Sequence, residues 1–532
     1  MSFENERHAQ WLLGQVQKGQ MSRREFLGRV SALGIAASLG TTMVGTALAN
    51  TPKRGGHMRL AMGHGATTDT LDPAVIENGL QWVAAYAVAN TLTELAPDGK
   101  LVPSLATEWE ASPDAKNWTF KLRKGVTFHN GKTMTAEDVI ASMNHHRGED
   151  TKSVGKPILA SVKSIKADGD SVVVFELTGG NADFPFSFNE ATFGIYPSGD
   201  GKIDWQAGGS GGYVLKEFEP GVRADFERNP NYWNENAAFA DSVELLSIVD
   251  SVARNNALLS GVVDAIDQVD LKTVNLISRA PGITVEEGVG PLHYVMPMQI
   301  DVAPFDNPDL RKALKFAIDR EELVKKVLLG HGKVGNDNPI GPSYRYYAAD
   351  LEQTAYDPEK ARFHMKKSGL GNVKLDLSAS DAAFAGALDA GQLFAASAEK
   401  AGININVIRE PNDGYWSNVW LKKPWCVSYW GGYATEDTMF TTGYAPGAAW
   451  NETHWEDEKF NSHLVAARAE LDETKRAEMY REMQVQLRDD GGVIVPMFAN
   501  GVSARTDKIA HGEVSWGRAF DGRRIMDRWW MV

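Results

Sequence analysis

Two extended apolar segments, far apart in the sequence, constrain the fold of this chain most strongly. Residues 293–300 lead into Ala303-Pro304-Phe305-Asp306-Asn307-Pro308 and then into a helix, and residues 493–500 follow Gly491-Gly492 near the C-terminus. The segment between them has roughly 200 residues, which is a normal size for one domain. A chain that enters a lobe along one segment and leaves it along the other forms two lobes joined by a hinge.

The length of the chain agrees with this division. Its 532 residues exceed what a single hydrophobic core normally supports, so two or three lobes are expected. We predict that lobe I comprises residues 50–296 and 494–532, and that lobe II comprises residues 297–493.

Helical and strand patterns alternate along the chain, which is typical of a mixed α/β protein. Thr135, with acidic residues in the turn after it, begins one predicted helix. Further helices are predicted at residues 308–329 and 357–368, and as a pair within residues 455–490. Strands are predicted at residues 117–122, 171–177, 212–218 and 373–378.

The N-terminal segment has the features of an export leader. Ser22-Arg23-Arg24-Glu25-Phe26-Leu27 precedes the apolar residues 30–48, and Ala47-Leu48-Ala49 provides the small residues that suit a signal peptidase. A membrane anchor is the alternative, because the uncharged run is long enough to span a bilayer, but it is poor in Leu, Ile and Phe. We predict a cleaved twin-arginine signal peptide at residues 1–49 and a periplasmic location.

The charge of the chain indicates which partners are unsuitable. The leader carries five basic and three acidic residues, so its removal changes the formal net charge from −14 to −16. A protein this acidic is not expected to bind DNA, RNA or anionic lipid.

Cys426 is the only cysteine, so an intrachain disulfide is excluded. Its neighbours in residues 425–430 are mostly apolar and aromatic, which predicts a buried strand. We therefore interpret Cys426 as a small hydrophobic core residue rather than a nucleophile.

An ordered series of motifs gives the chain a specific resemblance. The most informative stretch contains the strand Asn117-Trp118-Thr119-Phe120, a turn at Asn130-Gly131 and the helix start Thr135-Ala136-Glu137-Asp138-Val139. The other motifs are Thr70-Leu71-Asp72-Pro73, Pro103-Ser104-Leu105-Ala106, Gly209-Ser210-Gly211-Gly212-Tyr213, Arg228-Asn229-Pro230-Asn231-Tyr232-Trp233, Pro304-Phe305-Asp306-Asn307-Pro308 and Ala317-Ile318-Asp319-Arg320. Over essentially the whole mature length, the chain resembles the family 5 extracellular solute-binding proteins, the receptors of dipeptide, oligopeptide and nickel ABC importers.

The resemblance implies a fold, a function and a set of partners. The expected fold class is α/β: a two-lobed periplasmic binding protein type II-like fold with a third subdomain (cluster C) at about residues 89–208 and a ligand cleft between the lobes. The expected function is that of a periplasmic receptor that closes around a peptide-like small solute and delivers it to a membrane permease. We expect a monomer that has no cofactor, no metal and no catalytic residue.

One departure from the family pattern concerns the amino terminus of the ligand. In dipeptide and oligopeptide receptors, an aspartate after a strand tryptophan pairs with this group. Alignment on Trp430 and Phe440 puts Tyr433 in the place of that aspartate. A phenol cannot supply the negative charge, but Glu436 and Asp437 are near enough in sequence to do so.

A second departure concerns the ligand carboxylate, which dipeptide receptors hold with an arginine. The matching residues 378–384 of this chain include Asp381 and Phe384 and no arginine. Because an acidic side chain repels a carboxylate, we expect a ligand that is cationic or lacks a free C-terminal carboxylate.

Aromatic residues are concentrated in the same part of a chain that has 15 tryptophans. They would give a pocket flat apolar faces and cation–π attraction, although ordinary core packing is the alternative for most of them. The candidate wall residues are Trp416, Tyr429, Trp430, Gly431 and Tyr433. Asn78 and Trp82 of lobe I are further candidates, with a solvated loop and a packed tryptophan as the alternative.

Two other functions remain open. A nickel-chelate binder would need metal ligands, but His145, His146, His454 and His463 lack ligand spacing and are expected to be surface residues. A secreted hydrolase on a related scaffold would need a nucleophile elbow, a metal or a carboxylate pair, and the chain contains no Gly-x-Ser-x-Gly. Within the receptor class, the candidate solutes are a peptide, a cationic amine and an oligosaccharide, in that order.

Overall fold

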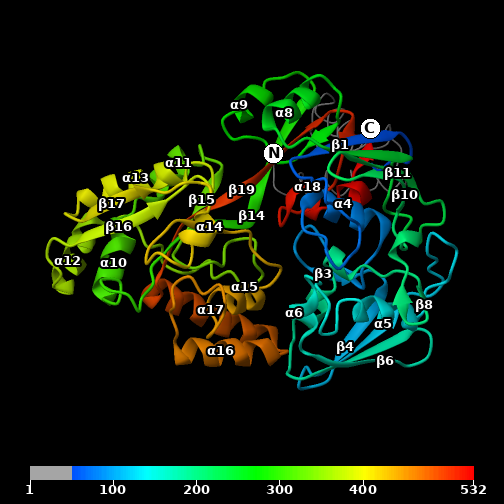
Figure 1. The fold of residues 1–532 in the computed structure, drawn as a ribbon, viewed down its shortest axis with the longest axis horizontal. Coiled ribbons are helices and arrows are strands. Elements are labelled where there is room, and N and C mark those ends of the chain that lie inside the picture. The colour runs from blue at the N-terminus through cyan, green and yellow to red at the C-terminus, as the bar shows by residue number, and fades with distance from the viewer. Residues whose placement is uncertain (1–50) are drawn as a thin grey trace, which may run out of the picture.

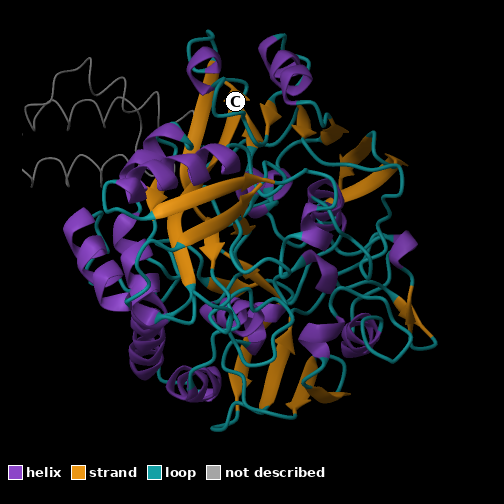
Figure 2. Ribbon diagram, turned by 60° about the vertical axis from the view of Figure 1, so that its left-hand side comes forward, coloured by secondary structure: helices purple, strands orange, loops and turns teal. Residues whose placement is uncertain are grey.

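The computed structural model describes residues 51–532 of the chain (Figure 1). The predicted twin-arginine signal peptide at residues 1–49 lies outside the described residues. Helices and strands are interleaved throughout (Figure 2), which confirms the predicted α/β class. None of the helices at residues 51–532 is both long and apolar enough to cross a membrane.

The largest sheet in the described part of the chain has nine strands. The strands are β1 (His57–Met62), β10 (Tyr213–Glu219), β11 (Arg223–Arg228), β12 (Ser242–Ser247), β13 (Ala265–Ile266), β14 (Ile283–Pro297), β15 (Gly332–Val334), β18 (Ser428–Trp430) and β19 (Val493–Thr506). Their order is β10-β11-β12-β1-β13-β19-β14-β18, with β15 paired to β19. The strand predicted at residues 212–218 is thus confirmed as β10, shifted by one residue.

The strands β14 and β19 form a long antiparallel ribbon between the two lobes (Figure 1). At one end, Ala504 and Arg505 of β19 pair with β13 in lobe I. At the other end, β14 pairs with β18 and β19 pairs with β15, and both of these partners belong to lobe II. The two extended segments from which we predicted two lobes are therefore confirmed as neighbouring strands.

Several short elements complete lobe I around the large sheet. The helices are α4 (Gly79–Val88), α8 (Ser251–Leu259), α9 (Val274–Ile277), α18 (Ala519–Gly522) and α19 (Ile525–Arg528), and the strand pair is β20 (Ile509–Ala510) with β21 (Trp530–Met531). The core combines α4 with residues from the C-terminal segment, such as Phe520, Ile525 and Trp529. The last residues of the chain thus pack against the first described ones.

The segment expected to form the third subdomain has a hydrophobic cluster of its own, from Leu92 to Ile195. Its main sheet has the order β4-β5-β7-β6, where the strands are β4 (Ala106–Ala111), β5 (Asn117–Leu122), β6 (Val162–Ala167) and β7 (Val172–Leu177). The other elements are β2 (Thr93–Leu95), β3 (Leu101–Pro103), β8 (Ser198–Gly199), β9 (Lys202–Ile203), α5 (Ala136–Asn144), α6 (Lys156–Leu159) and α7 (Phe184–Ser187). The predicted strand at residues 117–122 and the predicted helix after Thr135 are both confirmed.

Lobe II surrounds the parallel strands β16 (Lys374–Ala379) and β17 (Asn404–Arg409) with helices. The helices around these strands are α10 (Pro308–Ala317), α11 (Arg320–Lys326), α12 (Pro358–Ser368), α13 (Ala387–Glu399) and α14 (Tyr415–Asn418). The remaining helices of the lobe, α15 (Glu436–Gly443), α16 (Glu458–Ala469) and α17 (Glu473–Asp490), pack in a second hydrophobic cluster. Cys426 is buried next to β16, as the core interpretation predicted.

The single helix predicted at residues 308–329 is wrong, because the structure has two helices there. Ile318 leaves the helical conformation (φ −91°, ψ 124°), and the side chain of Asp319 then accepts a hydrogen bond from the backbone N–H of Glu322. An aspartate in this position caps a new helix by satisfying one of its free N–H groups. The apolar periodicity continues across the break and therefore did not reveal it.

A buried ion pair fixes the start of α11 to the hinge ribbon. Nη2 of Arg320 lies 2.7 Å from both carboxylate oxygens of Asp337, and neither side chain is more than 3% exposed. Asp337 also accepts a hydrogen bond from the backbone N–H of Val495 in β19. The loop that leads to residues 342–345 is thereby attached to both elements.

Asp337→Asn is expected to destabilise the protein by about 3–5 kcal/mol, because it leaves the Arg320 guanidinium buried without its counter-charge. Urea unfolding followed by tryptophan fluorescence measures this change. Asp350→Asn is the matched control, since its partner Arg481 and Asp350 itself are both exposed, and it should leave the midpoint nearly unchanged. Equal unfolding midpoints for the two variants would show that the buried Arg320–Asp337 ion pair does not stabilise the fold.

Candidate ligand-binding site

A cavity of about 600 Å³ lies between the two lobes. Lobe I with its subdomain contributes Tyr86, residues 95–100, Phe186, Asn189 and Glu190; lobe II contributes residues 342–345 and 433–436; the C-terminal segment contributes residues 513–518, Gly522, Arg523, Arg524 and Arg528. A ligand in this cavity would touch both lobes. Such a position couples ligand binding to closure.

A second cavity of about 490 Å³ adjoins the first and has mostly aromatic walls. Its lining residues are Trp416, Trp420, Ser428, Tyr429, Trp430, Gly431, Gly432, Tyr433, Trp450 and Arg518. Tyr433 and Arg518 line both cavities, so the two are neighbours across these side chains. The structure thus brings together the predicted candidates Trp416, Tyr429, Trp430, Gly431 and Tyr433.

The strand β18 and the contacts between rings position the aromatic walls. Successive residues of a strand point to opposite faces, so Tyr429 is 44% exposed while Trp430 is 6% exposed. The rings of Trp416 and Tyr429 meet edge to face at 5.6 Å, and Trp450 contacts both Trp420 and Trp430 at 6.0 Å. Each ring is therefore held by another ring rather than free to rotate.

Glu452 is a candidate supporting residue of the site that sequence reasoning missed. Its buried carboxylate accepts hydrogen bonds from the indole N–H groups of Trp420 (2.6 Å) and Trp430 (2.7 Å). Burial raises the pKa of Glu452, while these hydrogen bonds act in the opposite direction. The carboxylate orients two walls of the aromatic cavity from behind. Only its proximity in sequence to Trp450 could have indicated this role.

Glu436 lines the interlobe cavity, and the backbone N–H of Tyr346 donates a hydrogen bond to its carboxylate at 2.5 Å. Burial raises the pKa of Glu436 to about 7; neighbouring Asp183 also raises it, and Arg345 opposes this effect. Asp437 is different, because it pairs with Arg468 at 3.0 Å within lobe II and lines neither cavity. Burial nevertheless raises the pKa of Asp437 to about 6.

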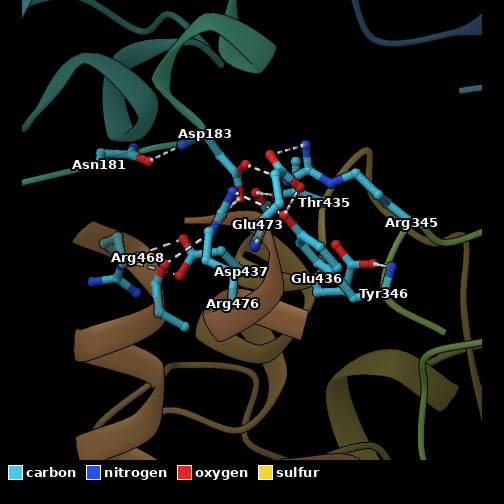
Figure 3. Close-up of polar contacts among 12 residues, drawn as sticks. Asn181, Asp183, Arg345, Tyr346, Thr435, Glu436, Asp437, Arg468, Glu473 and Arg476 are labelled. Atoms are coloured by element: carbon cyan, nitrogen blue, oxygen red, sulfur yellow. Dashed lines mark hydrogen bonds and ion pairs between the residues drawn. The ribbon is translucent and has the colours of Figure 1, made fainter. Parts of the chain in front are cut away.

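A cluster of charged groups joins the subdomain to lobe II beside the cavity (Figure 3). Asp183 of the subdomain points to two arginines of lobe II, Arg476 at 2.6 Å and Arg345 at 3.0 Å. Asp183 and Arg476 are both nearly inaccessible to solvent. The backbone N–H of Ala182 also donates to the carbonyl of Arg468 at 2.6 Å. These contacts hold the lobes together on one side of the cavity.

The structure places four other candidates outside the walls of the two cavities. Asp381 is exposed, and Phe384 stacks on Tyr294 at 3.8 Å within the core of lobe II. Asn78 caps α4 by accepting hydrogen bonds from the backbone N–H groups of Leu80 and Gln81. Trp82 supports the site indirectly, because it lies beneath the guanidinium of Arg523, which does line the cavity.

Sequence reasoning also missed the arginines of the interlobe cavity. Arg345, Arg518, Arg523, Arg524 and Arg528 all line it. Four of them fall between positions 518 and 528 of an otherwise acidic chain. This concentration of arginines in the sequence could have indicated a basic part of the site. The expectation of a cationic ligand relied on Asp381, and that residue is not in either cavity wall.

The prediction that His145 and His146 are surface residues is wrong for His146. This side chain is fully buried, with Nδ1 2.6 Å from the hydroxyl oxygen of Ser153 and the ring 5.2 Å from that of Phe193. Burial lowers the pKa of His146 to about 4. Residues 51–532 contain no group of three or more His, Cys, Asp or Glu side chains that could hold a metal ion.

Two lobes joined by a two-stranded ribbon, with a cavity lined from both sides, are the architecture of the periplasmic binding protein fold. The model of the bacterial extracellular solute-binding proteins, family 5 Middle, matches residues 100–452, which is more than half of the chain. The chain belongs to this family, as its motifs predicted.

Individual relatives are distant but cover most of the chain. The dipeptide-binding protein of Escherichia coli is 25% identical over 448 residues, 74% of this chain and 80% of that protein. The glutathione-binding protein GsiB of Pectobacterium atrosepticum is 23% identical over 84% of this chain and 89% of that protein. The structure of HbpA2 from Haemophilus parasuis matches with a TM-score of 0.78 at 20% identity, covering 88% of this chain and 99% of the other. DppA from Helicobacter pylori, solved with the peptide STSA, matches with a TM-score of 0.71 at 22% identity, covering 90% and 99%.

Glu436→Gln is expected to change the pH dependence of stability. Folding holds the proton of Glu436 up to about pH 7, whereas the unfolded chain releases it near 4.5, so the wild type loses stability as pH rises between these values. The variant should lack this loss and should be more stable than the wild type at pH 8, by on the order of 3 kcal/mol. Glutamine keeps an oxygen for the N–H of Tyr346.

Urea unfolding at pH 5 and pH 8 measures the effect of Glu436→Gln. Glu478→Gln, on the exposed face of α17, is the control and should follow the wild type at both values. A Glu436→Gln variant with the same pH dependence as the wild type would show that the buried carboxyl is not protonated.

Proposed function

We propose that this protein is the solute receptor of an ABC importer and that it captures a peptide-like solute in the interlobe cavity. The observation that carries the proposal is a cavity whose walls come from both lobes, which are connected by the ribbon of β14 and β19. A ligand that contacts both walls binds the closed arrangement more tightly than an open one. This difference in affinity is what drives closure.

The hinge is proposed to lie in the middle of the ribbon, at a pair of facing glycines. Gly288 pairs with Gly501, and the regular register of β14 is interrupted between Val289 and His293. A Cβ atom added to Gly288 would lie 2.1 Å from the ring of Trp516, and one added to Gly501 would lie 3.0 Å from it. Small residues thus let Trp516 lie against the ribbon at the point where bending is expected.

The peptide-like class of the solute is supported by the site and by the relatives. The relatives include a dipeptide-binding protein and a glutathione-binding protein. The aromatic cavity would accept an apolar or aromatic side chain, while the interlobe cavity offers charged and polar groups for the peptide backbone and termini. We further propose that the protein works as a periplasmic monomer after twin-arginine export, binds its solute without consuming it, and delivers it to an inner-membrane permease.

A ligand screen tests this function. The melting temperature of the purified protein should rise with at least one member of a panel of dipeptides, tripeptides and glutathione, by the amount that its dissociation constant dictates. Chromatography after incubation should recover that compound unchanged. Cleavage of a stabilising peptide would instead favour the secreted hydrolase.

Trp416→Ala is expected to weaken binding of the stabilising peptide by about 5–30-fold, because it removes one wall of the aromatic cavity. The ring is 39% exposed, so its loss should affect the ligand more than the fold. Asp381→Ala is the control, since Asp381 lines neither cavity. Calorimetric titration compares the two, and a larger loss for Asp381→Ala would move the site elsewhere.

Asp183→Asn is expected to favour open conformations, because it removes the charge that attracts Arg476 and Arg345 across the lobes. The radius of gyration of the ligand-free protein should increase, and solute affinity should fall by about 10–100-fold. Asp437→Asn removes a comparable ion pair within lobe II and should leave the radius unchanged. Small-angle X-ray scattering distinguishes these results, and identical curves for the two variants would contradict an interlobe role.

A further inference from the structure

The basic residues of the interlobe cavity divide into two groups. The first group forms ion pairs: Lys100 with Asp98 at 2.6 Å, Arg345 with Asp183 at 3.0 Å, Arg528 with Glu94 at 2.8 Å and Arg524 with Glu94 at 3.5 Å. Arg518 and Arg523 form the second group. Neither makes an ion pair with any carboxylate in residues 51–532.

Arg523 has an unusual environment for an arginine without a counter-charge. Its guanidinium carbon lies 3.3 Å from the ring centroid of Trp82, and Nη1 is buried without a hydrogen-bond partner in the described chain. Burial, together with the positive charge of Arg518, lowers the pKa of Arg523 to about 9. The side chain as a whole is half-buried, but an N–H group that is buried without a partner is unfavourable, because its desolvation is not offset.

The backbone that presents Arg523 is also strained. Phe520, Asp521, Gly522 and Arg523 all have positive φ angles, between 54° and 69°. Each residue other than glycine is strained in this conformation, because its Cβ lies too close to the following carbonyl oxygen. The side chain of Asp521 stabilises the turn by accepting hydrogen bonds from the N–H of Ser515 and from Arg528. Strain of this kind persists mainly where function requires the resulting geometry.

Arg518 completes the same wall from the hinge side. Its Nη1 donates to the carbonyls of Gly431 at 3.1 Å and Gly432 at 3.2 Å, so it connects the C-terminal segment to the loop after β18. This side chain lines both cavities. The two cations without carboxylate partners therefore face the space that a solute would fill.

The acidic residues of the cavity lining do not neutralise these two arginines. Asp98 is paired with Lys100, and the carboxylate of Glu436 accepts from Tyr346 and has a raised pKa. Glu190 and Glu513 form no ion pair with a residue of the described chain, although Glu190 acts on Arg523 electrostatically. The cavity thus has fixed positive charge where a ligand anion could bind.

We propose that Arg523 and Arg518 form an anion subsite and that the solute carries a carboxylate that binds there. This inference rests on the proposed receptor function and deepens it, because it replaces the cationic solute expected from the sequence with an acid. A guanidinium that already lies against an indole ring has its plane fixed and can bind a carboxylate through two parallel N–H groups. An apolar portion of the same solute occupies the neighbouring aromatic cavity.

The first test needs no ligand. Arg523→Met keeps an unbranched stem on Trp82 and the same backbone but removes the unpaired charge, so the melting temperature of the ligand-free protein should rise by about 2–4 °C. Arg524→Met is the matched control. Because Arg524 is paired with Glu94, its replacement should lower the melting temperature. A lowered or unchanged melting temperature for Arg523→Met overturns the proposal.

The second test uses glycyl-phenylalanine, glycyl-leucine and glutathione, each as the free acid and with every carboxyl group converted to an amide, in equilibrium dialysis with mass spectrometry. The wild type should retain the acids at least tenfold better than the amides. Arg523→Met should bind the acids at least tenfold more weakly and the amides within twofold, and Arg523→Lys should be intermediate. Loss of a charge-assisted bidentate contact is expected to have an effect of this size.

The outcomes separate the subsite from the receptor function. Equal retention of acids and amides by the wild type overturns the anion subsite and leaves the receptor function intact. Retention of none of the six compounds contradicts the peptide-like solute, and the ligand-free comparison of Arg523→Met with Arg524→Met then decides the subsite alone.

Discussion

The antiparallel pairing of β14 with β19 is the constraint on which the rest of the structure depends. Hydrogen bonds along this ribbon bring residues 283–297 beside residues 493–506, although about 200 residues of lobe II separate them. One end of the ribbon pairs with β13 of lobe I, and the other end pairs with β15 and β18 of lobe II. The strands β14 and β19 are two covalent connections between the lobes, and they are hydrogen-bonded to each other. This arrangement allows the lobes to bend relative to each other but resists their separation and independent rotation.

The C-terminal segment connects this ribbon to the cavity. Trp516 packs on Gly288 and Gly501 in the middle of the ribbon, and two residues later Arg518 reaches the carbonyls after β18. A further short turn presents Arg523 to the same cavity. A solute that contacts Arg518 and Arg523 thus lies against the segment that packs on the proposed hinge. Binding and bending share one rigid element, which is a physical route for coupling the two.

The sequence predicted those features that depend on neighbouring residues. The strand at Asn117–Leu122 was found because its alternation and following turn are local, and the hinge segments were found because they are long and apolar. The break at Ile318 was missed because the spacing of apolar residues continues through it, while the cap formed by Asp319 starts a new helix. The site was only partly found, since β18 places the aromatic candidates together, whereas Arg523 reaches the cavity through a left-handed turn that no local pattern specifies. Asp381 was expected in the site because it aligned with a ligand-binding position, yet its segment lies elsewhere.

The distribution of charge explains how such a cavity distinguishes its solute. Most charged groups of the cleft are already satisfied by partners, so they contribute little to the choice between an acid and an amide. Arg523 behaves differently, because its buried Nη1 has no partner in the described chain and a solute anion would supply one. An empty or wrongly filled cavity therefore leaves this group unpaired on closing, while the correct acid pairs with it. Selectivity arises from the difference between these two closed states rather than from the total number of contacts.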